Sequence, residues 1–119
     1  PFCYEPPRPH SVVLEVMSRH DVLVLPSIIE GRALVQQEAM SVGVPVIATR
    51  NAGADDLIKD GETGFLVPPR DPEILAEKIE WCASHKKECR EMGILAAERS
   101  ATLTWTKYGH TILELLGQV

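Results

Sequence analysis

Residues 22–46 read VLVLPSIIEGRALVQQEAMSVGVPV and decide the fold of this chain. The apolar run Val22 to Leu25 has the length of a strand, a helical pattern follows it, and a second apolar run spans Val44 to Ala48. This order indicates a βαβ unit with parallel strands. Because no polar residue interrupts the first run, we expect that strand to be buried on both faces.

The helix of this unit is expected from about residue 32 to 42, because Gly43 suits the left-handed residue after a helix and Pro45 cannot continue it. The stripe that faces the sheet should hold Val35, Ala39 and Val42. A neighbouring stripe should hold Leu34, Glu38 and Ser41. Two polar residues are expected to face away from the protein body, Gln36 and Gln37.

Strands and helices alternate along the whole sequence, which predicts an α/β fold with a parallel sheet and helices on both faces. The triplet Asp71-Pro72-Glu73 is a strong helix start, with aspartate as the N-cap and proline at the first helical position. The other expected elements are the end of a strand at 2–4, helices from about 10 and over 54–59, a strand at 65–67, and helices over 86–100 and from 104. The residues expected to point inward from the helices after Asp71 and over 86–100 are Leu75, Ile79, Cys82, Cys89, Met92 and Ala96. The apolar residues of the last helix are Trp105, Tyr108, Ile112, Leu115 and Leu116.

The composition is that of one globular domain of 119 residues, of which 45% are hydrophobic and 24% charged. The formal charge of −5 argues against a nucleic-acid surface, which would need a basic face. No apolar run approaches 18 residues, and no signal peptide is expected. The scattered cysteines disfavour a disulfide framework or a zinc site and fit a reducing cytoplasm. Because the chain opens with Pro1 instead of methionine, we expect a fragment of a longer protein.

Glu30 and Glu38 are the candidate functional residues, and Glu30 lies in the turn after a parallel strand, where such sheets bind ligands. A rise of about 1.5 Å per helical residue places the two carboxylates about 10 Å or more apart, which is too far for the roughly 5–9.5 Å of a glycoside-hydrolase pair. The helix N-terminus between them offers unpaired N–H groups to an anion. A glutamate, an anion site and a second glutamate in this order suit a ligand that presents hydroxyls, a diphosphate and further hydroxyls. A nucleotide-sugar is such a ligand, because carboxylates accept hydrogen bonds from hydroxyl groups. The structural alternative is that Glu30 caps a turn and Glu38 is a solvated helix residue.

Several segments together resemble the donor-site signature of the retaining GT-B glycosyltransferases of the glycosyltransferase 4 (group 1) family: PSIIEG (26–31), EAM (38–40) and GVPVIA (43–48). The hallmark of that family is two glutamates separated by seven residues, which Glu30 and Glu38 match. IKDGETG (58–64), FLVP (65–68) and DPE (71–73) follow in the family's order, and Thr104-Trp105 resembles the start of its final segment. The resemblance covers essentially the whole chain.

The resemblance implies that residues 1–119 are part of a C-terminal, Rossmann-like, nucleotide-sugar-binding domain. It implies that Glu30 is the catalytic-site residue that contacts the donor sugar, and that Glu38 binds the ribose hydroxyls. The backbone amides around Ala33, Leu34 and Val35 would meet the diphosphate, and Gly31 and Arg32 complete the donor-binding residues between the two glutamates. No metal or cofactor is implied, because the leaving diphosphate assists deprotonation of the acceptor.

The sequence departs from the family pattern at two places. Arg32-Ala33 stands where the family commonly has Phe-Gly, and Ala33 adds a methyl group where glycine lets the backbone approach a phosphate. Arg32 either adds a phosphate contact or is a surface residue. The later turn has Ala52-Gly53 in place of Gly-Gly, followed by Asp56 in place of glutamate.

The resemblance also implies partners outside this chain. An N-terminal acceptor-binding domain and upstream basic residues for the diphosphate are missing from it, so we expect these 119 residues alone to be inactive in sugar transfer. The strand Val22–Leu25 would lack a neighbour, which predicts an open edge and self-association. A cytoplasmic location is expected, with peripheral membrane attachment of a longer protein left open. Two alternatives remain: a non-catalytic interaction module derived from such a domain, and a nucleotide-sugar 2-epimerase.

Overall fold

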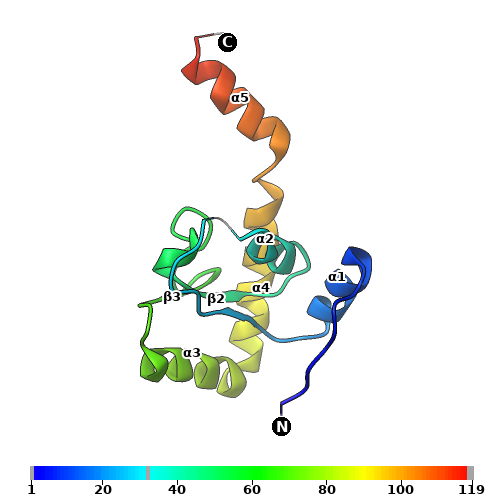
Figure 1. Cartoon of the computed structure of the whole chain (residues 1–119), viewed down its shortest axis with the longest axis vertical. Coiled ribbons are helices and arrows are strands. Elements are labelled where there is room, and N and C mark those ends of the chain that lie inside the picture. The colour runs from blue at the N-terminus through cyan, green and yellow to red at the C-terminus, as the bar shows by residue number, and fades with distance from the viewer. Residues whose placement is uncertain (1, 32, 118–119) are drawn as a thin grey trace.

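The computed structural model describes residues 2–31 and 33–117. Its elements are, in order, α1 (His10–Ser18), β1 (Leu23–Leu25), α2 (Leu34–Ser41), β2 (Val46–Thr49), the short 3-10 helix η1 (Arg50–Ala52), β3 (Gly64–Val67), α3 (Pro72–Ser84), α4 (Lys86–Ala101) and α5 (Trp105–Leu115). Figure 1 shows the sheet surrounded by helices, with α5 extending from the body. This alternation confirms the predicted α/β class.

The sheet has three parallel strands in the order β1-β2-β3. Every residue of β2 and β3 is buried. The edge strand β1 is only half-buried, so the expectation of burial on both faces is wrong for this strand. The physical reason is its position, because β1 pairs with β2 on one side and with none of the described strands on the other.

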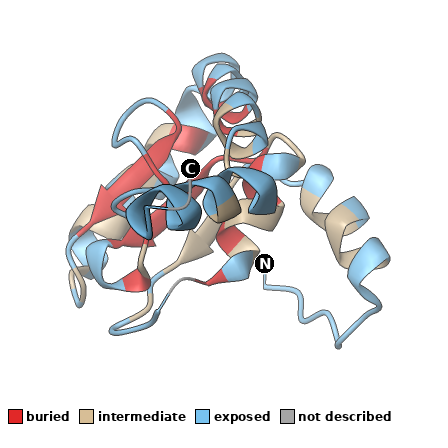
Figure 2. Cartoon of the chain, turned by 90° about the horizontal axis from the view of Figure 1, so that it is seen from above, coloured by how far each residue is buried: buried red, intermediate tan, exposed pale blue. Residues whose placement is uncertain are grey.

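The side chains of β2 alternate between two cores, one on each face of the sheet. The first core contains Val46 and Ala48 together with Met40 of α2 and Ala96 of α4. The second core contains Ile47 together with Cys82 of α3 and both Cys89 and Met92 of α4. Helices therefore cover both faces, as predicted, and α4 contributes side chains to both cores. Figure 2 shows buried strand in red, and pale blue exposed residues mostly on the helices and loops around it.

Helices α2 and α4 meet where the turn after α2 passes over α4. A Cβ atom built on Gly93 would lie 2.1 Å from the carbonyl oxygen of Gly43, so only a glycine fits at position 93. Gly43 has a φ of +80° and ends α2 as the predicted left-handed residue. The small residue on α4 thus lets the two segments approach closely enough for Met40 and Ala96 to share one core.

The predicted helix starts after Asp71 and Thr104 are confirmed. The Asp71 carboxylate accepts a hydrogen bond from the Ile74 backbone N–H at 3.1 Å. The Thr104 hydroxyl accepts one from the Lys107 N–H, also at 3.1 Å. Both residues therefore act as N-caps, which satisfy backbone groups that a helix start leaves unpaired.

Three local expectations are wrong. Residues 2–4 form no strand, and Phe2 and Tyr4 are exposed. Residues 54–59 form a single turn instead of a helix, with the Ile58 N–H bonded to the Ala54 carbonyl at 2.8 Å. Ile79 is 40% exposed, because the inner face of α3 is filled by other residues, namely Ile74, Leu75, Trp81 and Cys82.

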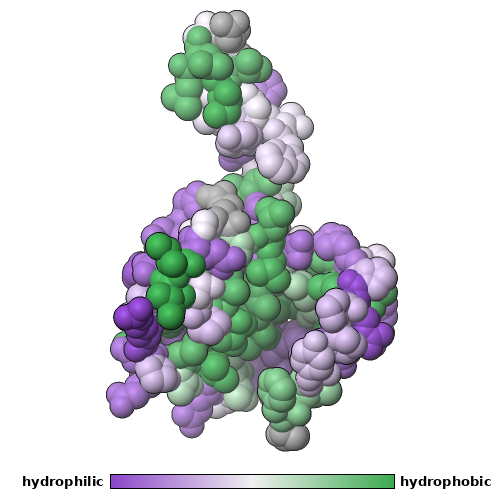
Figure 3. Space-filling model, viewed as in Figure 1, coloured by the Kyte–Doolittle hydropathy of each residue, from purple (hydrophilic) through white to green (hydrophobic). Residues whose placement is uncertain are grey.

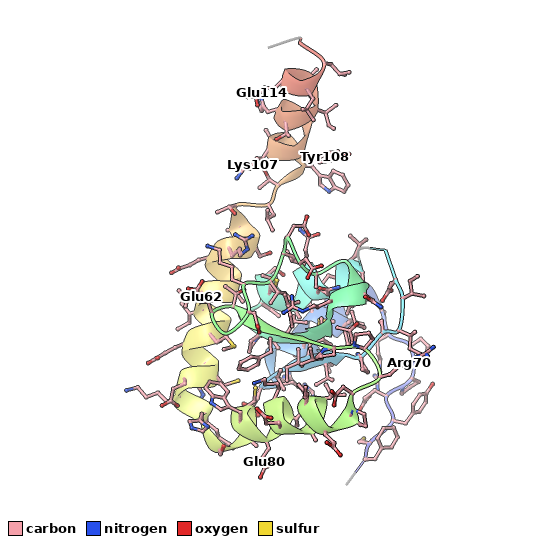
Figure 4. All side chains as sticks on the ribbon, turned by 90° about the vertical axis from the view of Figure 1, so that its left-hand side faces the viewer. Glu62, Arg70, Glu80, Lys107, Tyr108 and Glu114 are labelled. Carbon is pink, nitrogen blue, oxygen red and sulfur yellow. The ribbon has the colours of Figure 1, made fainter. Side chains whose placement is uncertain are left out.

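Helix α5 is the most exposed element of the chain. None of its residues is buried, although it carries the large apolar side chains of Trp105 and Leu115, and the exposed Leu116 follows as its C-cap. It lengthens the molecule to 53 × 30 × 27 Å. Figure 3 shows hydrophobic surface gathered at its far end, and Figure 4 shows Lys107, Tyr108 and Glu114 along it, outside the body.

The two cysteines in the second core are free and buried, as predicted. Burial raises the pKa of Cys82 to about 12, and the adjacent Cys89 thiol adds to this shift. Burial also raises the pKa of Cys89. Both thiols therefore stay protonated at neutral pH and are poor nucleophiles. In the part of the chain that the structure describes, no helix is both long and apolar enough to cross a membrane.

Candidate functional site

The loops that follow β1 and β2 lie side by side at one edge of the sheet. The strands are parallel, so their carboxyl ends meet there. The first loop leads from Leu25 to α2 and carries Glu30. The second continues through η1 to Gly53, which adopts the left-handed conformation with a φ of +65°. This is the position that the sequence predicts for a ligand site.

The Glu30 side chain is exposed, but its position is fixed at two points. The Ser27 hydroxyl donates a hydrogen bond to Glu30 Oε2 at 2.8 Å. The Glu30 backbone N–H donates to the carbonyl of Asn51 in the second loop at 2.9 Å. The carboxylate is therefore held at the sheet edge through Oε2, while its other oxygen, Oε1, has no partner among the described residues.

The second loop is tied to the first by two further bonds. The Asn51 side-chain amide donates to the Ile28 carbonyl at 2.9 Å. The Thr49 hydroxyl donates to the Ser27 carbonyl at 2.5 Å. Together with the Glu30 bond, these contacts fix the conformation of the Glu30 loop from the end of the neighbouring strand.

Gln36 corrects the predicted orientation of α2, because it is fully buried instead of facing away. Its Nε2 donates to the Ala52 carbonyl at 2.7 Å, whereas Oε1 is buried without a partner among the described residues. The stripe toward the first core is accordingly formed by Ala39 and Met40, with Val42 packed against them. The Gln36 amide occupies a buried position where an apolar side chain would be expected, because it donates a hydrogen bond to the backbone carbonyl of Ala52 in η1.

The predicted diphosphate-binding residues lie at or just before the start of α2. Ala33 is the N-cap residue and makes no side-chain capping bond, so the first turn of α2 keeps backbone N–H groups for an anion. Gly31 is exposed, and a Cβ atom built there would meet nothing within 4 Å. Val35 is half-buried. Arg32 lies outside the described residues.

The Leu34 side chain lies in an apolar environment, apart from the backbone amide to which the resemblance assigns the diphosphate contact. Its side chain is 63% exposed and lines a groove of about 510 Å³ between α2 and the start of α5. Gln37, Trp105 and Tyr108 also line this groove. The Leu34 side chain therefore takes part in an apolar surface, and only its backbone belongs to the helix terminus.

The Glu38 side chain lies on α2, one turn beyond the helix start, and is 28% exposed. Its Oε1 is 3.0 Å from His10 Nε2, at the first residue of α1. Glu38 is therefore a partly exposed helix residue that is bonded at one carboxylate oxygen. Oε2 has no partner among the described residues.

Both acids were predicted from the sequence, but the residues that hold them were not. Ser27 is three residues from Glu30, a spacing that could have indicated a local bond. Asn51 is 23 residues from Ile28, whose carbonyl it holds in the Glu30 loop. His10 is 28 residues from Glu38, and no local pattern signals either contact. In the part of the chain that the structure describes, no group of three or more histidine, cysteine or acidic residues could hold a metal ion.

The comparisons with known proteins agree with this arrangement. The model of the family "Glycosyl transferases group 1" matches residues 6–99. The D-inositol 3-phosphate glycosyltransferase of Corynebacterium diphtheriae is 34% identical over 111 residues, which are 93% of this chain and 26% of that protein. The solved structure of sucrose-phosphate synthase from Thermosynechococcus elongatus matches with a TM-score of 0.81 and 34% identity, over 92% of this chain and 28% of that chain. HepE of Anabaena in complex with UDP-glucose matches with a TM-score of 0.76 and 26% identity, over 88% of this chain and 29% of that chain.

The chain spans about a quarter of the length of the curated relatives that it matches. The structural matches confirm the predicted fold class, a Rossmann-like part of a GT-B glycosyltransferase. The family match runs from the proline-rich segment before α1 to the last turns of α4 and so includes both glutamates. On this evidence, the chain belongs to the group 1 glycosyltransferase family.

Proposed function

We propose that this chain is the donor-binding part of a retaining glycosyltransferase, which moves a sugar from a nucleotide-sugar to an acceptor. The observation that carries the proposal is the placement of two held carboxylates, Glu30 and Glu38, on either side of the uncapped start of α2. Carboxylates accept hydrogen bonds from hydroxyl groups, and a helix N-terminus binds phosphate. The site therefore suits a ligand with hydroxyls at both ends of a diphosphate.

In this proposal Glu30 binds the donor sugar, and the start of α2 with residues 31–35 binds the diphosphate. Glu38 binds the ribose. The anomeric configuration of the sugar is retained in this proposal, and the leaving diphosphate takes the proton of the acceptor hydroxyl. Neither a metal nor a cofactor is then required. The solved complex of HepE with UDP-glucose supports a nucleotide-sugar as the donor class.

The rest of the proposal concerns the whole protein. We propose that residues 1–119 are part of a C-terminal donor domain, and that an N-terminal domain of the full-length protein binds the acceptor. The coverage of about a quarter of the curated relatives supports this division. Sugar transfer would then require the full-length protein, which we place in the cytoplasm because its described cysteines are free thiols. A role in carbohydrate biosynthesis, with or without peripheral membrane attachment, follows from the same proposal.

Calorimetric titration of the full-length protein with UDP-, GDP- and ADP-glucose tests this function. We expect one of the three to bind, and Glu38→Ala to weaken its affinity about 10- to 100-fold, because one charge-assisted hydrogen bond is worth about 1.5–3 kcal/mol. Glu80→Ala is the matched control, since Figure 4 shows Glu80 on the outer side of α3. It should leave the affinity unchanged.

Two outcomes would contradict the proposal. Binding of none of the three nucleotide-sugars would favour a non-catalytic interaction module. Binding that is insensitive to Glu38→Ala would point to a different site, including one of an epimerase type. Either result would remove the assigned role of α2.

We also propose that the outer edge of β1 pairs with a second copy when the 119-residue chain is isolated. The Leu23 N–H bonds to the Pro45 carbonyl at 3.0 Å, so in a parallel strand the Val24 N–H and carbonyl point to the outer side. A groove of about 410 Å³ flanks this edge, and α1 lines its far side with Val13, Val16 and Met17. An open edge with half-buried apolar residues favours association.

Sedimentation velocity at increasing concentration is expected to show association of the chain. Val24→Pro removes only the outward N–H and keeps the bonds to β2, as edge strands tolerate proline. It should restore a monomer. A chain that stays monomeric at every concentration, or a variant that associates equally, would contradict edge pairing.

A further inference from the structure

The carboxylate of Glu38 is bonded across two helices to a histidine that lies outside the predicted signature. His10 Nε2 and Glu38 Oε1 are 3.0 Å apart, although 28 residues separate them in the sequence. His10 is the first residue of α1, and Glu38 lies in the second turn of α2. The contact therefore depends on the packing of α1 against α2.

The two side chains differ in exposure, which suits His10 as the supporting residue and Glu38 as the residue that meets the ligand. The His10 side chain is 67% exposed, and that of Glu38 is 28% exposed. A glutamate on a helix surface normally samples several rotamers, and a ligand that binds it must fix one of them. The bond from His10 fixes Glu38 before any ligand arrives.

The bond also leaves half of the carboxylate available. His10 occupies Oε1, and Oε2 has no partner among the described residues. A carboxylate has about four lone-pair positions on its two oxygens, so the bond to His10 still permits two hydroxyl donors. A ribose diol presents two neighbouring hydroxyl groups.

We propose that His10 is a positioning residue that holds the Glu38 carboxylate in the orientation required by the ribose diol of the nucleotide. This inference rests on the proposed function, because it assigns the ribose to Glu38. His10 acts through Glu38 and contributes only to recognition of the 2′- and 3′-hydroxyls. Its removal therefore affects ribonucleotides and spares nucleotides that lack both hydroxyls.

The test compares UDP, GDP or ADP, whichever binds the full-length protein tightest, with its 2′,3′-dideoxy counterpart by calorimetry. We expect His10→Ala to weaken the ribonucleotide about two- to tenfold, the cost of ordering one side chain on binding. The affinity for the dideoxy compound should not change. His10→Gln keeps a hydrogen-bond donor and should restore at least half of the lost affinity.

Two further variants separate this inference from the proposed function. His20→Ala is the matched control, because His20 is an exposed histidine just after α1 whose Nδ1 contacts the Val16 carbonyl instead of α2. It should have no effect on either nucleotide. Adding His10→Ala to Glu38→Ala should cause no further loss, since the histidine acts through the glutamate.

The inference is overturned if His10→Ala weakens both nucleotides equally, which would indicate a general effect on the fold. It is also overturned if His10→Ala has no effect, or tightens binding, while Glu38→Ala still discriminates between the two nucleotides. In these cases the proposed function stands. If Glu38→Ala itself fails to discriminate, the ribose role of Glu38 fails, and the inference about His10 fails with it.

Discussion

Replacement of Gly93 by alanine is expected to destabilise the chain by about 3 kcal/mol or more, near the upper end of the cost of overpacking a core. The new Cβ atom would lie 2.1 Å from the Gly43 carbonyl oxygen and 3.0 Å from its carbonyl carbon. These are backbone atoms at the end of α2, and they cannot move aside as a side chain would. Relief of the clash requires α2 and α4 to separate, which opens the first core. Thermal unfolding followed by circular dichroism should show a midpoint lower by roughly 10 °C or more.

Gly109→Ala provides the control for Gly93→Ala. Gly109 also lies within a helix, α5, but a Cβ atom there would meet nothing within 4 Å. Alanine has the higher helix propensity, so this variant should be as stable as the parent or slightly more stable. A similar loss of stability in both variants would show that close packing is not the reason for glycine at position 93.

Glu30→Gln is expected to weaken binding of the nucleotide-sugar about 10- to 100-fold and to leave binding of the corresponding nucleoside diphosphate unchanged. Glutamine keeps the size of the side chain and an acceptor for the Ser27 hydroxyl, so the loop should stay in place. The variant loses the charge, which roughly doubles the strength of a hydrogen bond and so contributes about 1–1.5 kcal/mol to each bond from a sugar hydroxyl. The difference in affinity between the two ligands, measured by calorimetry on the full-length protein, isolates the contribution of the sugar.

The control for this substitution is Glu62→Gln, since Glu62 is an exposed glutamate in the turn before β3. It removes the same charge from a segment outside the β1 and β2 loops. If Glu30→Gln weakened the sugar-bearing and sugar-free ligands equally, Glu30 would act on the loop or on the diphosphate, and its assignment to the sugar would be wrong.

Much of the fold could be predicted because its signals are local. The glycine and proline after α2 end that helix, and Asp71 starts α3 at the expected residue. The apolar runs correctly located the three strands of the sheet within one or two residues at each end. These features depend on backbone conformation and on neighbours within a few positions.

The errors arose where distant partners decide the outcome. Gln36 was assigned to the surface because of its polarity, but the carbonyl of Ala52, 16 residues away, makes its burial possible. The edge position of β1 reduced its burial, which an apolar run alone cannot reveal. For the same reason the two acids of the candidate site were found from the sequence, whereas the supports from Asn51 and His10 were not.

The contribution of α4 to both cores has a consequence for how the protein forms during synthesis. The strands and α2 lie within residues 23–67, yet the cores on the two faces of the sheet are completed by Ala96 and Met92 of α4. A ribosome adds about 5–20 residues per second, so the nascent βαβ unit exists for seconds before α4 leaves the exit tunnel. During that interval both faces of the sheet are partly uncovered. Chaperone binding to the nascent chain should therefore end once α4 has left the exit tunnel.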